Sequence, residues 1–103
     1  MENEDQLWRQ GGFRRFQIVR CVVTGHRGRF GVEVAIIDPK SSAPAFIDFV
    51  MLKDGVGHLT PEEFPPVGTV LEAVTLDFMP DGELRLSASP SSIARQREHD
   101  AES

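Results

Sequence analysis

Residues 13–37 read FRRFQIVRCVVT-GHRGR-FGVEVAII, and this stretch decides the fold. The first run, Phe13–Thr24, is rich in β-branched and aromatic residues and holds neither glycine nor proline, which is typical of a strand. Phe30–Ile37 has a similar character and predicts a second strand, and Gly25–Arg29 predicts the turn between them. Alternation along the first run places Cys21 on a mostly apolar face, so we interpret it as a small buried hydrophobic residue.

Three more strands follow toward the C-terminus. Apolar runs predict them at Ala45–Leu52, Val70–Met79 and Glu83–Ser89. Thr60–Glu63 (TPEE) combines a capping residue, a proline at the first helical position and a glutamate three residues on. It predicts a short helical turn between the third and fourth strands. This order of elements predicts an all-β chain, folded as a five-stranded Greek-key barrel of the OB type.

The organisation around the barrel is predicted to be simple. A length of 103 residues favours one domain, which we place at residues 13–89. Residues 1–12 are polar and end in two glycines, so we expect a flexible N-terminal segment in which only Trp8 packs on the barrel. The polar composition of residues 90–103 predicts a flexible tail or a marginal helix. An acidic N-terminus and the lack of a long apolar run predict a cytoplasmic protein with no membrane partner.

The sequence contains no pattern that is typical of catalysis or metal binding. The three histidines have no metal-ligand spacing with one another or with the single cysteine. No serine lies in a nucleophile-turn context, and the glycine pair Gly25 and Gly28 leads into a strand and not into a helix. The sequence therefore predicts a binding protein that is not an enzyme and that uses no metal or cofactor.

Charge is unevenly distributed along the chain. The formal net charge is −5, which gives no general attraction to nucleic acid. Residues 9–29, however, contain six arginines and no acidic residue, and thirteen of the sixteen acidic residues follow residue 30. This asymmetry predicts a basic patch and an acidic patch on one molecule, although ordinary solvated surface would carry the same charges.

Three short motifs occur in the order that is typical of S1-type RNA-binding domains. They are Phe30–Val34 (FGVEV), Pro66–Val70 (PVGTV) and Gly82–Ser87 (GELRLS). Over about residues 16–89 the chain therefore resembles an S1 domain, which is an OB barrel. The resemblance implies that single-stranded RNA binds across the second and third strands, with aromatic rings stacked on bases and cations beside phosphates.

The resemblance also implies five site positions in this chain. Phe30 matches the first aromatic residue of the family, and Asp77 matches its aspartate. The positions of a second aromatic residue, a histidine and an arginine fall on Glu33, Asp48 and Glu83. Three carboxylates in these places would oppose the binding of a phosphate chain, because like charges repel.

Two hypotheses for the function follow. The first is weak, salt-sensitive binding of RNA or single-stranded nucleic acid through the loop between the first two strands and through the second strand. Its predicted site residues are Phe30, Arg27, Arg29, Arg20, Arg85 and Asp77, and Arg14 and Arg15 extend the basic track. The alternative is a protein-interaction module whose acidic face engages a basic partner. That face comprises Glu33, Asp48, Asp77, Asp81 and Glu83.

Overall fold

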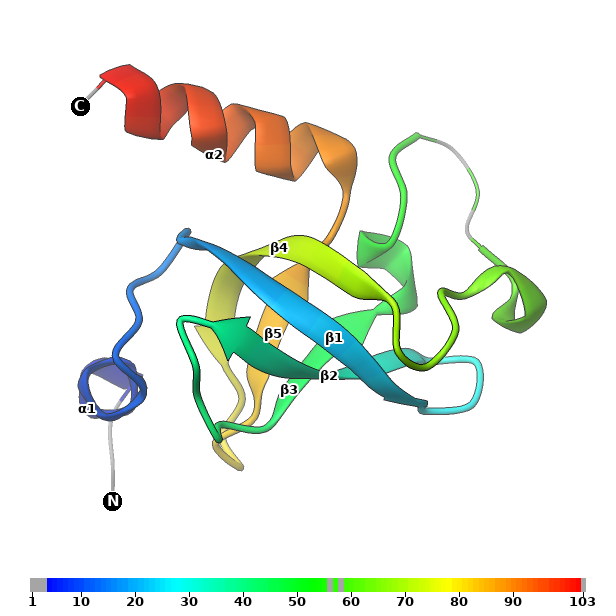
Figure 1. The fold of residues 1–103 in the computed structure, drawn as a ribbon, viewed down its shortest axis with the longest axis horizontal. Coiled ribbons are helices and arrows are strands. Elements are labelled where there is room, and N and C mark those ends of the chain that lie inside the picture. The colour runs from blue at the N-terminus through cyan, green and yellow to red at the C-terminus, as the bar shows by residue number, and fades with distance from the viewer. Residues whose placement is uncertain (1–3, 56, 58, 103) are drawn as a thin grey trace.

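The computed structural model describes residues 4–55, 57 and 59–102, and it contains a closed barrel with a helix toward each end of the chain (Figure 1). The strands are β1 (Ile18–His26), β2 (Gly31–Asp38), β3 (Ala45–Asp48), β4 (Val70–Phe78) and β5 (Leu84–Ser87). Each strand falls in or beside a range that the sequence predicted. The five-stranded OB barrel is therefore confirmed.

The barrel is closed by hydrogen bonds in the order β1-β2-β3-β5-β4, with β4 paired back to β1. Neighbouring strands are antiparallel except for β3 and β5, which run parallel. The β1–β2 register pairs His26 with Val32 at one end and Arg20 with Asp38 at the other. The β1–β2 turn and the start of β2 therefore lie at one end of the barrel, and Arg20 lies toward the opposite end.

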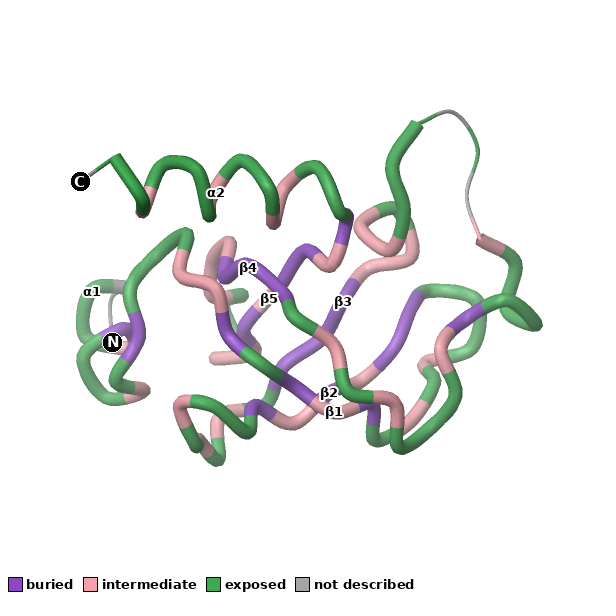
Figure 2. Tube along the Cα trace, turned by 45° about the horizontal axis from the view of Figure 1, so that its top comes forward, coloured by how far each residue is buried: buried purple, intermediate pink, exposed green. Residues whose placement is uncertain are grey.

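Alternate residues of the strands fill the interior of the barrel (Figure 2). In β1 the side chains of Val19, Cys21 and Val23 are buried, as their spacing predicted. The largest fully buried side chains are Ile36, Ile47, Leu84 and Leu86. Cys21 is a buried hydrophobic residue, as the sequence predicted.

Cys21 gives a prediction that is easily measured. Burial raises the pKa of its thiol to about 11, so we expect a thiol reagent at pH 8 to leave the native protein unmodified. In the unfolded chain the thiol ionises near its ordinary pKa of about 8.5. Stability should therefore be unaffected below that value and should fall as the pH rises toward 11. Thiol titration with and without urea checks the first expectation, and rapid labelling of native protein would contradict it.

The start of β1 differs from the prediction. The predicted strand began at Phe13, whereas β1 begins at Ile18. Phe16 has a φ of 62°, which interrupts an extended chain. The buried Thr75 of β4 binds this segment, because its hydroxyl donates to the Arg14 carbonyl at 2.7 Å and accepts from the Gln17 amide at 2.9 Å. Contacts with a distant strand thus override the local β preference.

The segment between β3 and β4 also differs in part from the prediction. The predicted third strand ended at Leu52, but β3 ends at Asp48 and a 3-10 helix, η1 (Phe49–Met51), follows. The Asp48 carboxylate caps this turn by accepting from the Val50 amide at 3.1 Å. The predicted helical turn before β4 is confirmed as η2 (Pro61–Glu63).

Each terminal segment contains a helix. The expected flexible segment 1–12 contains α1 (Glu4–Gly11) where it is described, and residues 1–3 lie outside the described part. Trp8 packs edge-on against Phe78 with 4.7 Å between ring centroids, which confirms its packing on the barrel. For residues 90–103 the sequence predicted a flexible tail or a marginal helix, and the described part forms the helix α2 (Pro90–Glu102). This helix has no buried residue, and ion pairs and hydrogen bonds join it to the rest of the chain.

Among the residues that the structure describes, no helix has the length and apolar character needed to cross a bilayer.

Candidate nucleic-acid interface

The predicted Phe30 site lies where the β1–β2 turn meets the end of β3. The Arg27 amide donates to the Gly31 carbonyl at 3.0 Å, and the Phe30 amide donates to the Arg27 carbonyl at 3.0 Å. The Phe49 amide then donates to the Phe30 carbonyl at 2.9 Å. These bonds fix the backbone of Phe30 while 56% of its surface remains exposed. Phe30 is thus an aromatic ring held on a rigid support at the surface.

A shallow apolar groove of about 600 Å³ opens beside this ring. The lining residues are Arg29, Phe30, Phe49, Leu59, Thr60 and Pro61. The Arg29 guanidinium carbon lies 5.6 Å from the centre of the Phe30 ring. An exposed ring with an adjacent cation can stack on a flat base and face its phosphate.

The second predicted arginine of this loop, Arg27, is engaged within the protein. Its guanidinium binds Glu83 with N–O distances of 2.6 and 2.9 Å, and it contacts Glu33 at 3.1 and 3.2 Å. It also lies over the Phe46 ring, 4.2 Å from the ring centre. Hydrogen bonding to Glu83, followed by that to Glu33, raises the pKa of Arg27 above its ordinary value. We call Arg27, Glu33, Glu83 and Phe46 the Arg27 cluster.

Arg85 and Asp77 form a second internal pair. Two parallel bonds of 2.7 Å join the guanidinium of Arg85 on β5 to the carboxylate of Asp77 on β4. This bidentate contact lowers the pKa of Asp77 and raises that of Arg85. The two predicted site residues therefore bind each other.

The acidic face predicted for a protein partner is largely occupied by these local contacts. Glu33 and Glu83 belong to the Arg27 cluster. Asp48 caps η1, and the Asp81 carboxylate accepts from the Glu83 amide at 3.0 Å in the β4–β5 turn. Each of these carboxylates thus has a structural role, and the partner hypothesis stays a prediction.

Arg20 lies apart from the groove. It is exposed on β1, where its backbone pairs with those of Asp38 and Glu72, six residues before His26 at the other end of the strand. At about 3.3 Å per residue the separation is roughly 20 Å. The structure therefore does not bring Arg20 together with Phe30.

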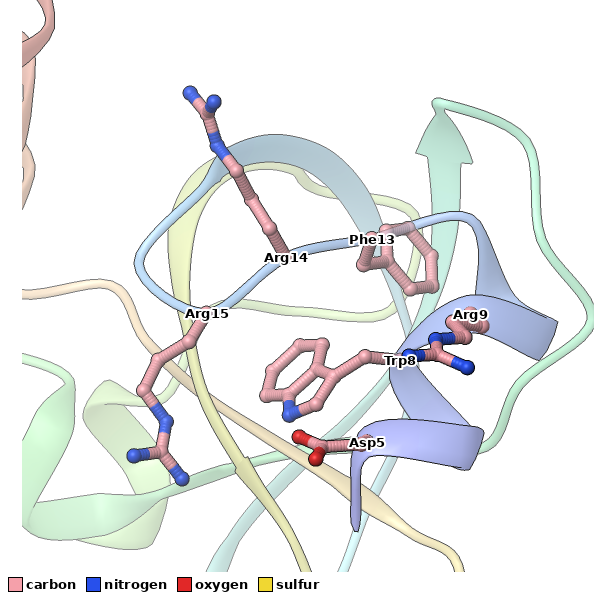
Figure 3. A pocket seen from close by; sticks show the side chains of 6 residues that line it. All are labelled: Asp5, Trp8, Arg9, Phe13, Arg14 and Arg15. Carbon is pink, nitrogen blue, oxygen red and sulfur yellow. The ribbon is translucent and has the colours of Figure 1, made fainter.

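Arg14 and Arg15, the predicted extension of the basic track, line a different pocket together with Trp8 and Phe13 (Figure 3). Their side chains point to different sides of the chain, and Asp5 lies near the indole of Trp8 (Figure 3). Arg9 lines this pocket as well. Arg9, Arg14 and Arg15 are thus separated from Arg27 and Arg29 by the length of β1.

Phe49 is the site residue that the sequence analysis missed. It lies within the predicted third strand Ala45–Leu52, but the structure places it after β3, where it is partly buried and lines the groove beside Phe30. The available signal was Asp48, since an aspartate often starts a turn by capping the following amides. That signal would have ended the strand one residue before Phe49.

In the part of the chain that the structure describes, no three histidine, cysteine, aspartate or glutamate side chains gather as a metal site would require.

The closed β1-β2-β3-β5-β4 barrel, with an exposed aromatic ring at the start of β2, has the fold of an S1-type OB domain. No protein-family model and no curated protein gave a significant match to the sequence. Comparison with solved structures found similar structures at low sequence identity, and this similarity shows the fold alone.

One similar structure is a chain of the a/eIF2alpha–aDim2p–rRNA complex from Pyrococcus horikoshii OT3, with a TM-score of 0.65 and 16% identity over 86% of this chain and 51% of that one. GSP13 from Bacillus subtilis has a TM-score of 0.60 and 19% identity over 74% of this chain and 55% of that one. A multidomain protein with nucleic acid binding domains from Streptococcus pneumoniae TIGR4 gives 0.55 and 20%, over 87% and 29% of the two chains. This chain thus spans about half or less of the length of these structures.

Proposed function

We propose that this chain is a non-enzymatic module that binds RNA or single-stranded nucleic acid through the groove beside Phe30. The observation that carries the proposal is the exposed ring of Phe30, whose backbone makes two hydrogen bonds and which is accompanied by Arg29. Stacking on such a ring tolerates any base, because every base has a flat aromatic face. The similar structures that include an rRNA complex and nucleic acid binding domains support this class of ligand.

Each groove residue has a role in the proposal. Phe30 stacks on a base, and the partly buried Phe49 forms the apolar floor beside it. Arg29 faces the phosphate. Arg27 supports the turn from within its own cluster, and it contributes a long-range positive potential that Glu33 and Glu83 largely cancel.

The remaining predicted residues act farther from the groove. The bond between Arg85 and Asp77 holds β5 against β4. Arg20 would contact only a nucleic acid long enough to extend along β1. Because few cations face the ligand and the net charge is −5, binding should be weak and should fall with added salt.

The test is fluorescence anisotropy of a labelled single-stranded RNA at about 50 and about 200 mM salt. Phe30→Ala should weaken binding roughly 5- to 150-fold, which corresponds to about 1–3 kcal/mol for one stacked base. Arg29→Gln should weaken binding at low salt and reduce the slope of log affinity against log salt by about one.

The matched control is Ile37→Ala, which removes an exposed apolar side chain from the opposite end of the same strand. It should leave the affinity unchanged. Absence of binding by wild-type protein at low salt would refute the proposed function. Binding that Phe30→Ala and Arg29→Gln do not weaken would refute the proposed groove.

A further inference from the structure

A second exposed aromatic ring lies at the other end of β1. Phe16 is 50% exposed, and it is the one residue other than glycine with a positive φ in the described part of the chain, at 62°. A bulky side chain in this backbone conformation is a genuine outlier and is strained. Such strain persists only where surrounding contacts determine it, and it often accompanies a functional site.

The contacts that hold Phe16 come from Thr75, which is completely buried. The Phe16 amide donates to the Thr75 carbonyl at 2.8 Å, and the Thr75 amide donates to the Gln17 carbonyl at 3.0 Å. The Thr75 hydroxyl binds Arg14 on one side of Phe16 and Gln17 on the other. The backbone on both sides of the ring is therefore fixed, and the ring is directed outward and not into the core.

The ring of Phe16 forms one wall of a groove of about 280 Å³ between β4 and α2. The other lining residues are Val74, Leu76, Ser92, Arg95 and Gln96. The guanidinium carbon of Arg15 lies 5.9 Å from the centre of the Phe16 ring. The groove thus has an apolar floor, a flat aromatic wall and an arginine on α2, and none of its lining residues is acidic.

We propose that this groove is a second nucleotide site, in which a base stacks on Phe16 and the attached phosphate binds Arg95. Charge complementarity favours an anion at a groove lined by cationic and neutral side chains. The flat wall favours an aromatic group beside that anion, and a nucleotide combines both. Gln96 also lines the groove, and its side-chain amide nitrogen donates to Asp100 at 2.9 Å.

The position of α2 determines the width of this groove. Arg97 on α2 binds Glu72 on β4 at 2.6 Å, and Asp54 binds the first turn of the helix through Ser91. The Phe16 groove and the Phe30 groove lie near opposite ends of β1, so this inference does not depend on the proposed Phe30 site.

The test is a titration of isotope-labelled full-length protein with adenosine 5′-monophosphate, monitored by backbone amide chemical shifts. Saturable shifts are expected at Phe16, Leu76 and Gln96, and they should persist in the Phe30→Ala variant. Phe16→Leu retains an apolar side chain but removes the flat ring, so it should weaken binding about tenfold. Arg95→Gln should weaken binding of the monophosphate and leave binding of adenosine unchanged.

Three results would overturn the inference. They are no shifts near Phe16 in folded protein, equal binding by wild type and Phe16→Leu, and the same shifts with inorganic phosphate alone. Failure of the Phe30 proposal would be recognised separately, because Phe30→Ala should remove only the shifts around its own groove. A midpoint that is lower with octa-adenylate than with the monophosphate assigns the site to a strand, and equal midpoints assign it to a free nucleotide.

Discussion

Gly31→Ala should lower the free energy of unfolding by about 4 kcal/mol or more, and it should leave little folded protein at ambient temperature. Gly31 has a φ of 143°, in a region that side chains rarely adopt. A Cβ placed there would lie 2.1 Å from the carbonyl oxygen of Ile47 and 3.0 Å from the amide nitrogen of Phe49. Both neighbours are backbone atoms where β2 meets β3 and η1, so neither can move without breaking the pairing of the two strands.

Gly28→Ala is the matched control for this substitution. Gly28 also has a positive φ, at 55°, but a Cβ there would meet no atom within 4 Å. Its cost should be about 1–2 kcal/mol, the strain of the left-handed conformation alone. Urea unfolding followed by far-UV circular dichroism measures both variants. A Gly31→Ala protein as stable as Gly28→Ala would show that the approach of the β2 and β3 backbones is not as close as described.

Trp8→Ala should be the second most damaging substitution, with a loss of about 3–5 kcal/mol. Trp8 is only 8% exposed, and its indole packs edge-on against Phe78 of β4. Its backbone carbonyl also accepts from the Phe13 amide at 3.1 Å, so α1 is joined directly to the segment that precedes β1. Removal of the indole leaves a cavity between α1 and the barrel and exposes Phe13 and Phe78 to water.

Trp8→Phe provides the comparison, because it retains an aromatic ring of smaller size and should cost roughly half as much or less. Equilibrium unfolding in urea measures both variants, with circular dichroism as the signal since Trp8 is the only tryptophan. If Trp8→Ala proves as stable as wild type, α1 contributes nothing to the fold and the domain is limited to residues 13–89.

The barrel could be predicted because its signals are local. β-branched runs, alternation and the glycine-containing turns lie within each element, and they placed all five strands within a few residues. The errors occurred where a distant contact decides the backbone. Phe13–Phe16 has strong β propensity, yet its backbone is bound by Thr75, whose hydroxyl donates to the carbonyl of Arg14, 61 residues earlier in the sequence. Phe49 has strand character too, but the cap by Asp48 turns the chain.

The candidate site was predictable residue by residue but not in its connections. Phe30 was assigned to the surface from its motif, and it is exposed. The contact of Arg27 with Glu83 depends on the register of the barrel, which brings together residues that are 56 positions apart. Two acids that looked incompatible with a phosphate chain are therefore ligands of an arginine of this same chain.

The Arg27 cluster has a consequence for how the outer surface of β2 and β3 can be used. The guanidinium of Arg27 is flat and cationic, and it already lies where an incoming base would stack on Phe46. A ligand that stacked on Phe46 would have to displace the Arg27 guanidinium. Glu33 and Glu83 would then lose their counterion. An arginine of the protein itself thus occupies the position on Phe46 that a ligand would need, so the Arg27 cluster disfavours binding at this ring.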